Sequence, residues 1–134
     1  MKKIYLFASI YLILGLVFGV FYREFTLFHE YLGKTQLAVL HTHSLVMGTF
    51  FLFFVLIFNK LFKINEIKSY PTWFIIYNIG FIGFLNTLLI RGIGQVLSWE
   101  LSGFNHIAGL FHAILGVSLV WFIVIFGKSL KREY

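Results

Sequence analysis

The chain has 134 residues, of which 60% are hydrophobic, 21% are aromatic and only 12% are charged. A soluble domain of this size could not hide so much apolar surface, because small domains bury only about two-thirds of what their unfolded chain exposes. The composition therefore indicates an integral membrane protein. The absence of cysteine excludes disulfides, thiolate-held iron–sulfur clusters and covalent attachment of a c-type haem.

Four apolar runs are long enough to cross a bilayer, since a helix needs about 20 residues to span about 30 Å of hydrocarbon. They predict an all-α, polytopic membrane protein that forms one domain over residues 1–134, with spans at about 4–22, 37–58, 72–97 and 105–127. The first run follows Lys2 and Lys3 and ends without a small-residue cleavage pattern. We therefore interpret it as an uncleaved span and not as a signal peptide.

The positive charges gather in three of the segments outside the spans. These segments contain Lys2 and Lys3, then Lys60, Lys63 and Lys68, and finally Lys128, Lys131 and Arg132. By the positive-inside rule they face the cytoplasm, which predicts a multi-pass protein of the bacterial cell membrane with both termini inside. The net charge of +6 is then explained by topology and by attraction to anionic lipid, and no nucleic-acid partner is expected.

Two histidines, His41 and His43, stand near the start of the second span in the stretch HTHSLVMGTFF. Imidazoles inside hydrocarbon are costly and usually have a function. Two residues in a helix are about 200° apart, so the two rings should point in nearly opposite directions and cannot chelate one ion. Met47 shares a face with His43, and Gly48 shares one with His41. In the first span, Gly15 and Gly19 have GxxxG spacing, which favours close packing of a neighbouring helix within the bundle over a dedicated dimer face.

The fourth span contains His112, and the second and fourth spans run in the same direction. His112 should therefore lie at about the depth of His43. Gly109 and Gly116 flank it on its own helix face and leave a flat recess beside the imidazole. By contrast, His29 and His106 are expected nearer the membrane surface, without an assigned role.

Arg91 lies where the third span reaches the outer boundary of the membrane, and Arg23 ends the first span, so both are just outside the level of these histidines. They are either interfacial arginines solvated by headgroups or partners for a buried anion. A b-type haem fits the whole pattern, because its iron takes histidine nitrogens, its porphyrin packs on small and aromatic residues, and its propionates pair with arginine. The predicted cofactor-binding residues are His43, His41, His112, Met47, Gly109, Gly116, Arg91 and Arg23, with iron held by His43 and by His112 or His41.

The stretch HTHSLVMGTFF resembles two helices of subunit I of the haem-copper oxidases: the second, with an HxxxMxxFF-like run, and the tenth, with an HxH pair followed by Met-Gly. In this resemblance His43 matches the low-spin haem ligand of both helices, and His41 matches the ligand of the oxygen-reducing haem. Nothing corresponds to the copper-binding histidines or to the cross-linked tyrosine, so the resemblance does not imply oxygen reduction. The whole chain resembles a small, largely uncharacterised family of four-span bacterial membrane proteins marked by GVFYREF, KTQLAVLHTH, RGxxQV and GLFHxxLG.

The resemblance also implies an oligomer. The twelve helices of oxidase subunit I form three arcs of four, so three copies of a four-span chain would match the whole. The second spans of neighbouring chains would then sandwich the haem. The alternative is an intrachain site in which His112 faces His43, which needs only a monomer.

We therefore expect a membrane protein that binds haem b and serves electron transfer, haem handling or gas sensing, with a quinol or another redox partner if it is a cytochrome-like electron carrier. There is no complete catalytic constellation. Two alternatives remain open. One is a small transporter or channel component that uses intramembrane histidines for protons or metal ions. The other is a structural membrane subunit whose histidines only hydrogen-bond to one another.

Overall fold

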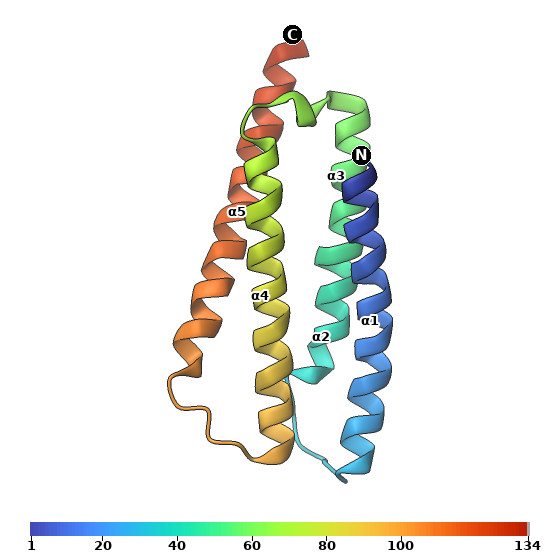
Figure 1. Cartoon of the computed structure of the whole chain (residues 1–134), viewed down its shortest axis with the longest axis vertical. Coiled ribbons are helices and arrows are strands. Elements are labelled where there is room, and N and C mark those ends of the chain that lie inside the picture. Colours follow the sequence, from blue (N-terminus) through green and yellow to red (C-terminus); the bar gives the residue numbers. More distant parts are fainter. Residues whose placement is uncertain (134) are drawn as a thin grey trace.

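The computed structural model describes residues 1–133, and four helical segments in it are long and apolar enough to cross a membrane (Figure 1). No strand occurs among the described residues. The predicted all-α fold with four membrane-spanning segments is thus confirmed. The elements are α1 (Lys2–Phe28), α2 (Leu37–His43), the π-helix η1 (Ser44–Phe50), α3 (Phe51–Phe62), the 3₁₀ turn η2 (Ile64–Glu66), α4 (Tyr70–Leu97) and α5 (Phe104–Glu133).

The second span consists of α2, η1 and α3 in direct succession. Helix α1 packs along all three of these segments, and α4 packs along α5. The two pairs are joined because α2 contacts α4, whereas α3 contacts α5. In α4, 50% of the most apolar stretch is buried, against 22–28% in the other three spans, so α4 is the most enclosed helix of the bundle.

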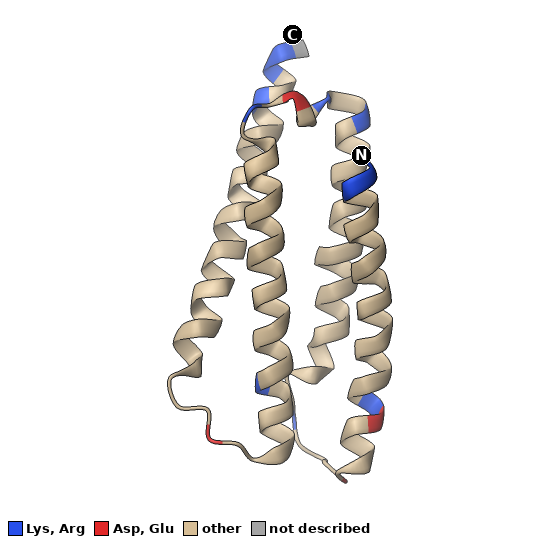
Figure 2. Ribbon diagram, in the orientation of Figure 1, with Lys and Arg blue, Asp and Glu red and all other residues tan. Residues whose placement is uncertain are grey.

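Both chain ends and the turn η2 lie at one end of the bundle, which we call the terminal end (Figure 1). The α1–α2 and α4–α5 connections lie at the opposite end, which we call the loop end. Figure 2 shows most of the Lys and Arg residues at the terminal end. This distribution is the one from which an inside location of the termini was predicted.

The π-helix η1 is a feature that the sequence pattern did not predict. The Phe51 N–H reaches back to the Val46 carbonyl, five residues earlier. Where such a wide turn returns to α-helical bonding, a carbonyl is left without its usual partner. The Tyr77 hydroxyl of α4 donates to the Met47 carbonyl at 2.6 Å, so an α4 side chain caps the irregular turn.

The glycines of the first span pack against the second span of the same chain. A Cβ at Gly15 would lie 2.7 Å from Leu45 Cδ2, and a Cβ at Gly19 would lie 3.8 Å from His41 Cβ. The GxxxG spacing therefore serves helix packing within one bundle. Nearby, the Ser44 hydroxyl donates to the Tyr11 carbonyl at 2.9 Å and fixes the register of the two helices.

Helix α1 continues to Phe28, beyond the end predicted for the first span at Tyr22. The Thr26 hydroxyl bonds back to the Tyr22 carbonyl at 2.8 Å, and the Phe21 and Phe25 rings stack at 5.0 Å, so polar and aromatic interface residues extend the helix. The helix ends where Glu30 takes a left-handed φ of 50°. The helix is therefore longer than the apolar run from which the span was predicted, because hydropathy does not detect an interfacial turn of helix.

Candidate functional site

The two histidines of the second span point to different neighbours, as their spacing predicted. The His43 ring packs on Phe84 of α4, with centroids 5.3 Å apart. His41 instead lies against Gly19 of α1. The Nδ1 atom of His41 is buried and has no hydrogen-bond partner among the described residues.

The His43 imidazole is oriented by its own helix. Its Nδ1 lies 2.7 Å from the Val39 carbonyl oxygen. A carbonyl can only accept, so this hydrogen bond requires the proton on Nδ1 and leaves the Nε2 lone pair free. The His43 side chain is only partly buried, so the bundle does not fully enclose it.

The Phe84 ring connects the two predicted iron ligands. It contacts the His43 ring at 5.3 Å and the His112 ring of α5 at 5.5 Å, and only 7% of Phe84 is exposed. One buried aromatic ring therefore contacts both imidazoles.

A cavity of about 300 Å³ brings together three of the predicted site residues, Arg91, Gly109 and His112. Phe84, Gln36, Thr87, Leu88, Asn105 and Ala108 line the rest of it. A Cβ placed at Gly109 or Gly116 would meet nothing within 4 Å, and both glycines and His112 are exposed, so this face of α5 is open. The cavity therefore combines a guanidinium group, an imidazole and an unfilled helix face.

The other predicted residues do not line this cavity. Arg23 is exposed on α1 and lies 3.9 Å from Glu24. Met47 is packed against the core, and His41 faces α1. Within the described chain, no three His, Cys, Asp or Glu side chains come close enough together to hold a metal ion.

The family model described as "Protein of unknown function (DUF2871)" matches residues 1–129. The chain belongs to this family. No curated protein and no solved structure matches it. Membership of an uncharacterised family, predicted from the sequence, is thereby confirmed. The likeness of the second span to the haem-copper oxidases stays a prediction.

Two of the motifs given in the sequence analysis, KTQLAVLHTH and RGxxQV, contact each other at the loop end. The Thr35 hydroxyl donates to the Gly92 carbonyl at 2.8 Å, and the Gln36 N–H donates to Gln95 Oε1 at 2.7 Å. A Cβ at Gly92 would lie 2.6 Å from the Leu37 nitrogen, so only glycine permits this approach. These contacts hold the start of α2 against the end of α4. The sequence analysis identified both motifs but did not predict that they contact each other.

Proposed function

We propose that the protein binds haem b near the loop end of the bundle, with His43 as the first iron ligand. The observation that carries this proposal is the 2.7 Å hydrogen bond between His43 Nδ1 and the Val39 carbonyl. Metal-binding histidines nearly always donate their second ring N–H to a carbonyl, carboxylate or water, which fixes the tautomer and the ring orientation. His43 has this arrangement before any metal is added.

The cavity beside His112 supports the same proposal. Arg91 offers a guanidinium group to a propionate, and the open face at Gly109 accepts a flat ring. Its volume of about 300 Å³ is at the lower end of ligand pockets, which cover about 300 to 1,000 Å³. The cavity therefore fits one edge of a porphyrin. The remainder would lie against lipid or a second chain.

Two arrangements supply a second ligand. In the first, His112 of the same chain binds the iron, and Phe84 contacts both imidazoles. This arrangement needs only a monomer. In the second, a histidine of a neighbouring second span binds it, as the likeness to oxidase subunit I implies. The second arrangement makes the protein a homotrimer or a dimer.

A bound haem would supply one-electron chemistry or a site for a diatomic gas, so the function proposed is electron transfer, haem handling or gas sensing. The chain's own part would be to orient the ligand histidine through Val39, to neutralise a propionate with Arg91 and to exclude water with its aromatic residues. A quinol or another redox partner is proposed only for the electron-transfer case.

The experiment is an absorption spectrum of the purified protein, followed by a pyridine haemochrome assay. We expect a red protein with a Soret band and a haemochrome of the b type. A protein that stays colourless after haemin is added in detergent would contradict the proposal. That result would shift support to the transport alternative, in which the histidines carry protons or metal ions.

A further inference from the structure

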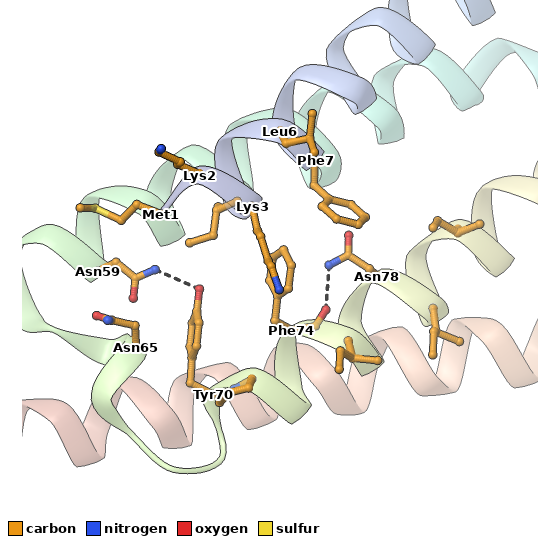
Figure 3. Close-up of a pocket in the computed structure, with 15 residues that line it drawn as sticks. Met1, Lys2, Lys3, Leu6, Phe7, Asn59, Asn65, Tyr70, Phe74 and Asn78 are labelled. Atoms are coloured by element: carbon orange, nitrogen blue, oxygen red, sulfur yellow. Dashed lines mark hydrogen bonds between the residues drawn. The ribbon is translucent and has the colours of Figure 1, made fainter.

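A second cavity, of about 920 Å³, lies at the terminal end between the first turns of α1, the first half of α4 and the end of the second span (Figure 3). We propose that it binds one anionic phospholipid with a hydroxyl-bearing headgroup. The proposal is independent of haem. It rests on three features of the cavity: the positively charged Lys3, the Asn59 Oδ1 atom without a hydrogen-bond partner, and an apolar slot along α4.

The polar end of the cavity contains a buried acceptor without a donor. Asn59 is only 4% exposed, and its Nδ2 donates to the Tyr70 hydroxyl at 2.9 Å. Its Oδ1 has no partner among the described residues, although Asn65 lies beside it (Figure 3). Asn78, deeper in the cavity, differs, because its Oδ1 accepts from Tyr11 at 2.7 Å and its Nδ2 donates to the Phe74 carbonyl. The unfilled position at Asn59 therefore fits a ligand hydroxyl, since buried polar groups are normally paired.

The charge at this end is positive. Lys2 and Lys3 both line the cavity, but the Lys3 side chain runs past Phe74, whereas the Lys2 side chain points away from Phe74 and Asn59 (Figure 3). No Asp or Glu lines the cavity, and neither lysine forms a salt bridge in the described chain. A phosphate group is the complement of such an unpaired ammonium group. This charge favours a phospholipid over a quinol, which has hydroxyl donors but no negative charge.

Below the polar end the cavity wall is apolar and open to lipid. Ile75, Ile79 and Ile82 follow one another along α4, over about 10 Å at 1.5 Å per residue. Ile75 and Ile79 are 59% and 55% exposed, so the slot is accessible from the side. An acyl chain would run along these residues while its headgroup stays beside Lys3 and Asn59. Both termini and the cavity are at one end, so the lipid belongs to the leaflet on that side.

The test is native mass spectrometry of the delipidated protein, titrated with phosphatidylglycerol or with phosphatidylcholine of the same acyl chains. Wild type should retain one phosphatidylglycerol in preference to phosphatidylcholine. Lys3→Gln should weaken phosphatidylglycerol binding about tenfold, the effect of losing one charge-assisted contact. Lys2→Gln is the matched control and should leave the preference intact. Ile79→Trp should fill the slot and reduce binding of both lipids without lowering Tm.

Three results would overturn the proposal. Equal binding of the two lipids would show that the headgroup is not recognised. Equal losses in Lys2→Gln and Lys3→Gln would show diffuse attraction to the basic end and no site. A quinone, or a second copy of the chain, that survives delipidation and is lost in Ile79→Trp would show that the cavity has a different occupant.

Discussion

The two histidines of the second span differ in how closely their surroundings are packed. On the face toward α1, a Cβ at Gly48 would lie 2.5 Å from Tyr11 Cβ, and His41 sits against Gly19. The His43 ring contacts Phe84, which also contacts His112 and lines the cavity. The surroundings of His41 are therefore closed by helix packing, whereas those of His43 adjoin a cavity.

This difference shows that an HxH pair is not one functional unit. A buried ring nitrogen without a partner, as in His41, costs about 1–3 kcal/mol, so packing and not hydrogen bonding holds that side chain. His43 has its Nδ1 bonded and its Nε2 free. The surroundings, more than the spacing, distinguish the proposed roles of the two residues.

The largest expected effect separates Gly48, packed against α1, from Gly109 on the open face of α5. Gly48→Leu would force a side chain into Tyr11 and Phe81, and overpacking of this kind costs about 1–3 kcal/mol or more. We expect a loss of folded protein on size-exclusion chromatography. Gly109→Leu enters open space and should leave the melting temperature nearly unchanged while it lowers haem binding. Equal losses of folded protein would mean that the α5 face is also closed by packing.

The second prediction concerns the residue opposite His43. If the second ligand is His41 of a neighbouring chain, His41→Ala should convert a six-coordinate iron spectrum to a five-coordinate one, and His112→Ala should not. Haem loading should also fall on dilution, because site assembly then depends on protomer concentration. The opposite pattern, with loss in His112→Ala alone, would place the iron within one chain.

A smaller effect is expected from the arginines. Arg91 lines the cavity, whereas Arg23 is exposed and lies beside Glu24. Arg91→Gln should weaken haem binding about tenfold, since a charged hydrogen bond contributes about 1.5–3 kcal/mol. Arg23→Gln should change the haem affinity little, as measured by titration of the apoprotein with haemin. A comparable loss of haem affinity in the two variants would indicate that Arg23 also contacts the haem.

The last prediction concerns the orientation of the protein in the membrane, and its substitutions should perturb the fold least. The chain has no cysteine, so single cysteines at Asn65 and Lys34 report without background. With the termini inside, an impermeant thiol reagent should label the Lys34 variant on intact cells and leave the Asn65 variant unlabelled. Labelling only at Asn65 would reverse the orientation and put the candidate haem site near the inner leaflet.

Much of the arrangement could be predicted from the sequence because it follows from length and helical period. The four spans and the opposite directions of His41 and His43 need no tertiary information. The register of the π-helix and the contact of Phe84 with both imidazoles could not be predicted, because any of 18 Phe residues would satisfy the same apolar pattern. The Gln36–Gln95 contact joins residues far apart in the chain, and hydropathy does not indicate which polar groups pair.

The most direct test of the central claim compares His43→Ala with His29→Ala. The two histidines make the same local hydrogen bond, since His29 Nδ1 lies 2.8 Å from the Phe25 carbonyl, but His29 is exposed after the end of α1. Orientation by a carbonyl is therefore matched and only the position in the bundle differs. We predict that His43→Ala loses the Soret band and the bound haem, while His29→Ala keeps both at wild-type stoichiometry. A normal spectrum and full haem content in His43→Ala would contradict the account.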